Sequence, residues 1–421
     1  MSGFRACVFW VLLPLGTSLP AQAVNWEAAP IHYSDSEATR NCVAKLQADL
    51  ESGRRELSGE DELSRLRSLL DQLNVPVSSQ TLVFSKTSLQ KPHITPETPR
   101  AIYFNDEVFV GYVQGGEIEI AAADPDLGTV FYTTEFAFDQ PPTLQRQANR
   151  CLSCHGGSRT GGVPGFQVRS VYPNTKGVPV IRAGSHLTNQ RSPLAERWGG
   201  WYVTGTHGDQ HHLGGFILAG KRRPEIIDNV SGENQTSLPA NVDAQRYLTG
   251  TSDITALMVM EHQIEAYNLL TQANFVAQHA EWQAGEDPVS DSHRQRISKA
   301  TQPLVACLCF DDEFAIQAPV LGAGDFANEF ETRGVTDSQG RSLRKLNLQT
   351  RLFESPLSYL VTSQTFAELP ETLLDELARQ IWHRFANDQA FTATLREIGP
   401  AWLTERYESP ERLLSTSPTS H

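Results

Sequence analysis

Basic residues, methionine and long apolar runs are all scarce in this chain of 421 residues. It has 35 Lys and Arg against 49 Asp and Glu, a formal net charge of −14, which argues against nucleic acid or an anionic membrane as a partner. Beyond the N-terminal segment, no stretch is long and apolar enough to hold the chain in a membrane, so we do not expect an integral membrane protein. After Met1, the only methionines are Met258 and Met260.

The N-terminal segment has the pattern of a secretory signal peptide. Arg5 precedes the apolar run 8–15, and Ala21-Gln22-Ala23 is a small-x-small cleavage site. The apolar run is too short to cross a bilayer. We therefore expect residues 1–23 to be removed and the mature chain to be periplasmic.

Cysteine is also sparse, but two of the six cysteines belong to the most informative pattern in the chain. Cys151-Leu152-Ser153-Cys154-His155 has the C-x-x-C-H spacing of covalent haem attachment, and the glycine-rich loop 156–165 follows it. Two thiols add to the porphyrin vinyl groups, and the next histidine ligates the iron. We expect one haem c, with Cys151 and Cys154 as anchors and His155 as proximal ligand. A coincidental dithiol or a structural disulfide is the alternative.

Three cysteines of the mature chain lie outside this pattern: Cys42, Cys307 and Cys309. Their odd number in a disulfide-permissive compartment leaves two possibilities. Cys42 bridges one of the other two, or all three are buried free thiols that behave as small apolar side chains. The sequence does not decide between these pairings.

Periodicity changes along the chain. Residues 34–52 and 59–73 have helical spacing of apolar residues, and Ser34 and Glu37 stand at capping-box spacing. Residues 101–104, 108–113, 118–120 and 129–132 have β character and are separated by turn sequences. Residues 156–250 are rich in Gly, Pro, Asn and Thr. Helices are expected again from Ser252 or Asp253 to beyond residue 276, and at 290–305, 368–386 and 388–398.

These patterns predict an α+β protein with helical N- and C-terminal regions and a β-meander that precedes an atypical cytochrome c-like haem site. The expected parts are a signal peptide (1–23), an N-terminal helical hairpin (24–80), a β-meander (81–140), a loop-rich haem-binding region (141–250), a helical C-terminal region (251–408) and a flexible tail (409–421).

The distal axial position decides the chemistry, because a second strong ligand makes an electron carrier and an open position makes a binder or a catalyst. We expect His262 first, since a helix fixes an imidazole better than a loop does, and His207 second. Each also has an ordinary role as a surface or core histidine. The other candidates are His186, His211, His212, Met258 and Met260. Arg159 or Arg169 suits a haem propionate, or both are solvated loop residues.

Several stretches together resemble a family of large exported single-haem proteins described only as containing a cytochrome c domain. The resemblance covers roughly residues 70–370 and rests on 77–88, 99–106, Cys151 to His155, 191–208, 261–263, 340–344 and 351–353. It implies haem binding at Cys151, Cys154 and His155 and electron transfer in general terms, without a substrate. Members often have a second histidine where this chain has Tyr267, whereas His207 and His212 fall on histidines of the pattern.

The sequence therefore predicts a periplasmic c-type cytochrome that transfers electrons through one covalent haem to an unknown redox partner, with a basic partner compatible with the net charge. The alternative is a peroxidase-like haem oxidoreductase, in which Tyr202, His207 or Tyr267 lines an accessible distal cavity. Whether the chain is an enzyme is left open. A haem-based ligand sensor is a third possibility.

Overall fold

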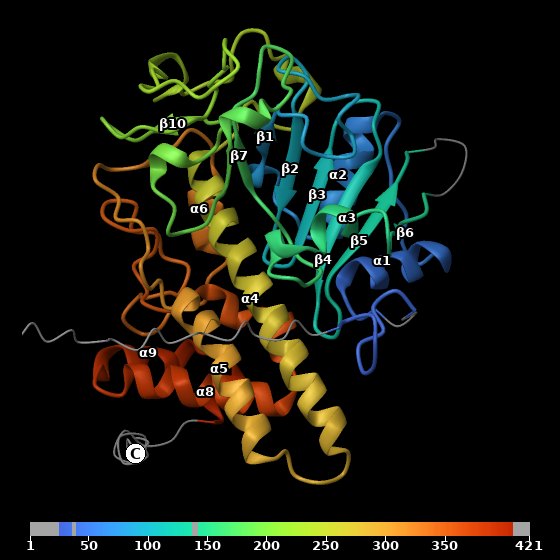
Figure 1. Cartoon of the computed structure of the whole chain (residues 1–421), viewed down its shortest axis with the longest axis vertical. Helices are drawn as coiled ribbons and strands as arrows, with labels where there is room; N and C mark the ends of the chain where they lie inside the picture. The colour runs from blue at the N-terminus through green and yellow to red at the C-terminus, as the bar shows by residue number, and fades with distance from the viewer. Residues whose placement is uncertain (1–24, 36–38, 137–141, 407–421) are drawn as a thin grey trace, which may run out of the picture.

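A seven-stranded antiparallel sheet forms the upper part of the protein in the computed structural model (Figure 1). The structure describes residues 25–35, 39–136 and 142–406, so the expected signal peptide and the flexible tail lie outside it. The strand order is β6-β5-β4-β3-β2-β1-β9. The strands are β1 (Thr81–Val83), β2 (Arg100–Phe104), β3 (Val108–Tyr112), β4 (Ile118–Asp124), β5 (Gly128–Thr134), β6 (Gln145–Arg146) and β9 (Trp201–Tyr202).

The two faces of the sheet pack against different helices, because side chains alternate along a strand. One face contributes Tyr103, Val110 and Ile120 to a core shared with α1 (Cys42–Glu51) and α2 (Glu62–Gln72). The other face contributes Phe104 and Phe109 to a second core that contains the long helix α4 (Ile254–Ala284). The site described below lies on this second face.

The first helix begins later than the capping-box spacing predicts. Asn41 caps α1 by accepting hydrogen bonds from the backbone N–H groups of Val43 and Ala44. The hydroxyl of Ser34 donates instead to Glu27, and Glu37 lies outside the described residues. The expected start at Ser34 is therefore wrong, because the residue that caps the helix is Asn41, seven residues downstream. The second helix has a capping box of its own, formed by Asp61 and Ser64.

Helix α4 begins after Asp253, whose carboxylate accepts from the N–H groups of Thr255 and Ala256, as expected. It runs along the sheet and returns through α5 (Asp291–Leu308), against which α8 (Glu371–Phe385) packs (Figure 1). The remaining helices are α3 (Leu152–His155), α6 (Phe326–Thr332), α7 (Gln364–Ala367), α9 (Gln389–Ile398) and α10 (Ala401–Thr404).

The glycine-rich region between the sheet and α4 contributes to two small antiparallel pairs, and the second pair is completed by a strand that follows α5 in the chain. They are β7 (Arg169–Val171) with β8 (Ser185–Leu187), and β10 (Gly205–Thr206) with β11 (Leu321–Gly322). The α+β class is thus confirmed. No helix in the described residues is long and apolar enough to cross a membrane.

Candidate functional site

The C-x-x-C-H residues lie on and beside a single helical turn at the edge of a pocket. The backbone N–H groups of Cys154 and His155 both donate to the carbonyl of Cys151, at 3.1 and 3.0 Å. Residues three apart on a helical turn point to the same side, so both thiols border the pocket. Cys151 is half-buried and Cys154 is exposed. Burial, reinforced by the nearby Glu119, raises the pKa of Cys151 to about 11.

The imidazole of His155 is held in one orientation. Its Nδ1 lies 2.9 Å from the carbonyl oxygen of Gly165, and only a protonated Nδ1 can donate to that oxygen. Phe131 of β5 packs against the ring, with centroids 5.0 Å apart. Burial lowers the pKa of His155, which favours the neutral ring. The neutral ring therefore keeps its lone pair on Nε2, the tautomer of a histidine that binds a metal through Nε2.

Helix α4 fixes the loop that orients His155. The Asn268 side chain accepts from the N–H of Phe166 at 2.9 Å and donates to the carbonyl of Phe166 at 2.8 Å. A Cβ at Gly165 would lie 2.3 Å from Oδ1 of Asn268, so only glycine permits this approach. Asn268 thereby sets the position of the carbonyl that holds His155.

The pocket itself is mostly apolar and contains about 1110 Å³ of space, including its open mouth. The sheet, α4 and the loop after α3 all contribute to its walls. Its apolar lining includes Val83, Leu89, Ile102, Phe109, Phe131, Phe166, Val168, Trp201, Met260 and Ile264. Such a pocket suits a large apolar ligand that is oriented by a few polar groups.

Two ion pairs border the pocket. Arg100 of β2 reaches across β3 to Glu119 of β4, with Nη2 and Oε2 2.7 Å apart and both side chains largely buried. Gly111 of β3 makes this possible, since a Cβ there would lie 2.1 Å from Nη2 of Arg100. At the rim, Arg150 donates to Glu117 with an Nη1 to Oε1 distance of 3.0 Å.

A third cation at the pocket, Arg169 of β7, has no carboxylate partner in the described part of the chain. Its contact is with the hydroxyl of Ser185, at 3.4 Å. Burial lowers its pKa, and Arg159 lowers it further. Arg169 is thus free to bind an anionic group at the pocket.

Met260 lines the pocket, whereas Met258 does not. Met260, Ile264 and Asn268 are spaced four residues apart, and all three face the pocket or the loop at its edge. Residues two positions apart on a helix point about 200° apart around its axis. Met258 and His262, four residues apart, therefore lie together on the other side of α4 from Met260.

His262 lies on the side of α4 that faces away from the pocket, and this contradicts the expectation that it is the distal ligand. Its Nδ1 donates to Oε1 of Gln190 at 2.5 Å, and its Nε2 accepts from the hydroxyl of Ser358 at 2.7 Å. The ring packs against Phe310 and Phe353 and is fully buried. Burial lowers the pKa of His262 to about 3. His262 is a core histidine with both nitrogens occupied.

The two polar neighbours of His262 are also structural. Glu261 pairs with the buried Arg197 at 2.8 Å. Gln263 donates to the carbonyls of Asn105 and Asp106. The Glu-His-Gln run thus ties α4 to three different segments.

His207, the second distal candidate, is also placed outside the pocket lining. Its Nε2 accepts from the N–H of Asn234 at 3.2 Å, so the neutral ring carries its proton on Nδ1, which is buried without a hydrogen-bond partner in the described residues. His212, 4.6 Å away between ring centroids, accepts from the N–H of Gly214 through Nδ1. Neither neutral ring leaves a lone pair free for a metal.

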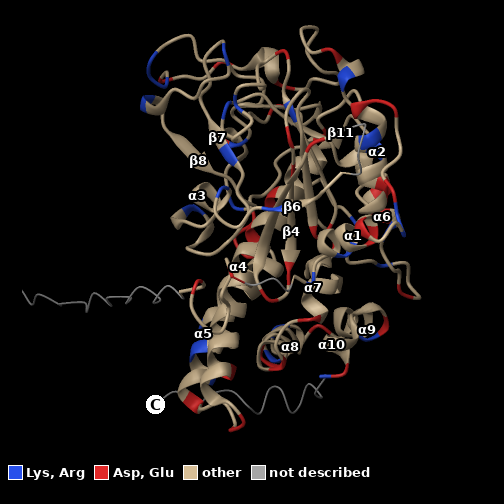
Figure 2. Cartoon of the chain, turned by 90° about the vertical axis from the view of Figure 1, so that its right-hand side faces the viewer, with Lys and Arg blue, Asp and Glu red and all other residues tan. Residues whose placement is uncertain are grey.

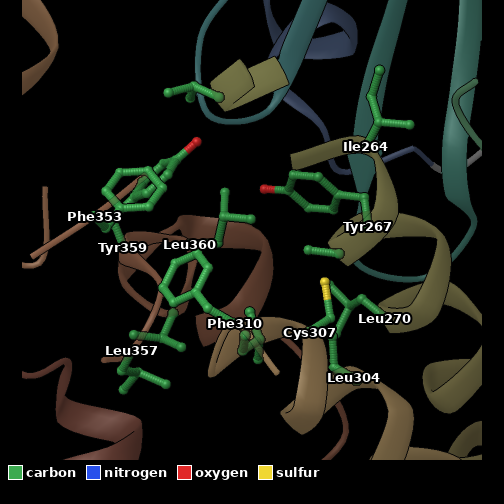
Figure 3. Close-up of a cluster of buried hydrophobic side chains, with 14 of the residues drawn as sticks. Ile264, Tyr267, Leu270, Leu304, Cys307, Phe310, Phe353, Leu357, Tyr359 and Leu360 are labelled. Carbon is green, nitrogen blue, oxygen red and sulfur yellow. The ribbon is translucent and has the colours of Figure 1, made fainter. Parts of the chain in front are cut away.

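The remaining expected distal groups do not line this pocket either. Tyr267 points from α4 into an apolar cluster with Phe310, Phe353 and Tyr359 (Figure 3). The hydroxyl of Tyr202 donates to the carbonyl of Pro96. His186 and His211 are exposed.

All five cysteines of the described residues are free thiols. Cys307 and Cys309 are buried and Cys42 is half-buried, as in the second of the two expected alternatives. Within the described ranges, no three His, Cys, Asp or Glu side chains gather as ligands of one metal ion.

Comparison with known proteins identifies no relative: the chain matches no family model, no curated protein and no solved structure.

Proposed function

We propose that this chain is an exported, periplasmic c-type cytochrome that transfers single electrons through one covalently attached haem. The observation that carries the proposal is the position of Cys151, Cys154 and His155 at the edge of one apolar pocket, with Nδ1 of His155 on the Gly165 carbonyl. Export rests on the sequence pattern of residues 1–23, which lie outside the described residues.

The residues around the pocket fit a haem. A porphyrin needs an apolar environment, thiols at its vinyl edge and an axial nitrogen with a free lone pair, and the pocket offers each of these. When bound, the haem supplies a one-electron Fe(III)/Fe(II) couple. Cys151 and Cys154 would hold the group, His155 would direct Nε2 toward it, and the aromatic lining would exclude water.

Met260 is the second residue that we assign to the haem iron, which its thioether would ligate. Met260 lines the pocket and Met258 does not. Among the described residues, His155 is the only histidine that lines the pocket. A thioether ligand in addition to the imidazole would raise the reduction potential of a bound haem. This ligand set favours a carrier over a catalyst.

Arg169 is the residue that we assign to a haem propionate. Its guanidinium lies at the pocket without a carboxylate partner in the described residues, and a guanidinium binds a carboxylate through two hydrogen bonds. Arg100 and Arg150 are already paired with Glu119 and Glu117.

The test compares Met260→Leu with Met258→Leu in the haem-loaded protein. Leucine is similar in volume, so both variants keep the core, and only the first loses an axial sulfur. We expect Met260→Leu to lower the reduction potential, to abolish the charge-transfer absorption of sulfur-ligated ferric haem and to open the iron to cyanide. Met258→Leu keeps the parent spectrum. Identical spectra for the two variants would contradict the assignment.

A second function, haem oxidoreductase, is favoured by the Arg100–Glu119 pair at the pocket wall, which provides a cation and a carboxylate for proton transfer. It requires an open axial position. A parent protein that is high-spin in the ferric state and that turns over hydrogen peroxide with an artificial donor would favour this function. Loss of that turnover in Glu119→Gln, with unchanged haem content, would then assign the carboxylate.

A further inference from the structure

Charge is distributed very unevenly along this acidic chain. Residues 158–223 contain nine Lys and Arg but only two Asp and Glu, whereas the rest of the chain has 26 and 47. This segment follows the C-x-x-C-H residues directly. The net charge of −14 therefore does not describe the surface next to the pocket.

Two of the nine basic residues are neutralised inside the structure. Arg191 pairs with Glu265, and Arg197 pairs with Glu261. The other seven form no ion pair within the described ranges, and all but the half-buried Arg169 are exposed. Because Arg169 is assigned to a haem propionate, we call the six exposed residues the basic face: Arg159, Lys176, Arg182, Lys221, Arg222 and Arg223.

The fold brings this face together from three segments. Arg159 belongs to the short helical turn Ser158–Thr160, which follows the C-x-x-C-H residues. The connection of the β7–β8 hairpin contributes Lys176 and Arg182. The 213–227 segment packs on the hairpin in a small apolar core, and the N–H of Leu218 donates to the carbonyl of Pro173 at 2.7 Å. The Arg223 guanidinium lies 5.6 Å from the centre of the Tyr172 ring. Figure 2 shows Lys and Arg gathered around β7 and the loops above it.

Exposed apolar side chains are interspersed with these cations. Ile181 is 90% exposed and Ile226 is 85% exposed. Val178 and Leu187 of the hairpin are exposed as well. Large exposed apolar side chains among charges are typical of a surface that contacts another molecule.

The basic face adjoins the pocket. Arg169 and Cys154 both line it, Cys154 is exposed, and Arg159 is close enough to lower the pKa of Arg169. A cofactor anchored at Cys154 would therefore lie beside these cations.

We propose that the basic face docks a one-electron redox protein with an acidic surface, at the edge of the cofactor near Cys154. This rests on the proposed haem function. One electron passes between the centres, so the iron changes between Fe(III) and Fe(II) while the partner gains or loses one electron. The partner is acidic, contrary to the basic partner that the net charge suggests. A lipid surface fits less well, since it offers no second redox centre.

The first test measures electron exchange of the haem-loaded protein with two inorganic probes, anionic ferrocyanide or ferricyanide and cationic hexaammineruthenium. If the basic face attracts anions, the rate of electron exchange with the anionic couple falls as the salt concentration rises, while the rate with the cationic complex increases. The opposite salt dependence, as the net charge alone dictates, would overturn the proposal.

A charge-reversal pair assigns the effect to the face. Arg182→Glu with Arg222→Glu is expected to lower the anionic rate at low salt about tenfold. The control, Arg296→Glu with Lys299→Glu on the exposed side of α5, changes the net charge equally and leaves the rate near that of the parent. Equal effects of the two pairs of substitutions would show that the basic face does not determine the rate.

Binding of poly-L-glutamate, measured by calorimetry, tests the docking claim without any redox chemistry. The parent should bind it in a salt-dependent manner, and the Arg182/Arg222 variant should bind it at least tenfold more weakly. No binding by the parent overturns the proposal even when haem is present. Binding by a parent protein that acquires no haem in a host that attaches haem to exported proteins supports the acidic-partner claim while refuting the proposed haem function. Sedimentation with anionic vesicles but no binding of poly-L-glutamate would reassign the face to a membrane.

Discussion

Replacing His262 by glutamine separates the core role seen in the structure from the ligand role that the sequence suggests. Glutamine is neutral at every pH and has a hydrogen-bonding amide of similar reach. In the structure His262 is fully buried and neutral, and its two nitrogens bind Gln190 and Ser358. We expect His262→Gln to leave the visible spectrum unchanged and to alter the dependence of stability on pH.

The magnitude follows from the pKa of His262. Burial lowers it from 6.5 to about 3 in the folded chain. Below pH 6.5 the unfolded chain therefore takes up a proton that the folded chain refuses, so stability that is present above pH 6.5 is lost progressively down to about pH 3. At pH 5 the loss is about 2 kcal/mol, since each pKa unit corresponds to about 1.4 kcal/mol. His212, whose pKa burial also lowers to about 3, adds a similar loss.

The assay is urea unfolding, followed by circular dichroism between pH 8 and pH 5, for the parent, His262→Gln and the exposed-histidine control His383→Gln. The parent should lose about 2 kcal/mol more than His262→Gln over this range. The control should follow the parent. Parallel pH profiles for the parent and His262→Gln, or a changed haem spectrum in His262→Gln, would refute the core role.

Three further substitutions test the contacts that build the site. Asn268→Ala removes both hydrogen bonds to Phe166 and should lower the free energy of unfolding by about 2–4 kcal/mol, whereas Gln272→Ala on the same helix serves as the control in urea unfolding. Gly111→Ala places a Cβ against Arg100 and should cost about 1–3 kcal/mol; a stable variant would show that Arg100 need not cross β3. Arg197→Met strands the buried Glu261 and should cost about 3–5 kcal/mol by the same assay, with partial recovery when Glu261→Gln is added.

Local periodicity predicts much of the secondary structure. The expected helices at 290–305, 368–386 and 388–398 correspond to α5, α8 and α9, because the apolar face of each helix is encoded within its own segment. The meander strands are found as well, although β4 and β5 extend beyond the expected ranges. The pairing of β1 with β9 was not predictable, since it joins residues more than a hundred positions apart and β9 has only two residues.

The side of α4 that faces the pocket could not be predicted from the sequence. Met258, Met260 and His262 stand at alternate positions of one buried helix, so the sequence alone cannot say which of them faces the pocket. The orientation of α4 about its own axis is set by contacts with residues distant in sequence, including those of Asn268 with Phe166 and of Gln263 with the 105–106 turn. A stripe of Met260, Ile264 and Asn268 at four-residue spacing was the one available signal. The Arg100–Glu119 pair had no such signal, since it requires the register of three strands.

Intact-mass analysis under denaturing conditions tests the central claim most directly. The protein is expressed with its N-terminal segment in a host that attaches haem to exported proteins, then unfolded and extracted with acid acetone. We expect the mature polypeptide to retain the mass of one haem, the Cys151→Ala/Cys154→Ala variant to lose it, and the Cys307→Ala/Cys309→Ala control to keep it. A parent chain without haem, or a Cys151→Ala/Cys154→Ala variant that retains haem as firmly as the parent, would contradict the account.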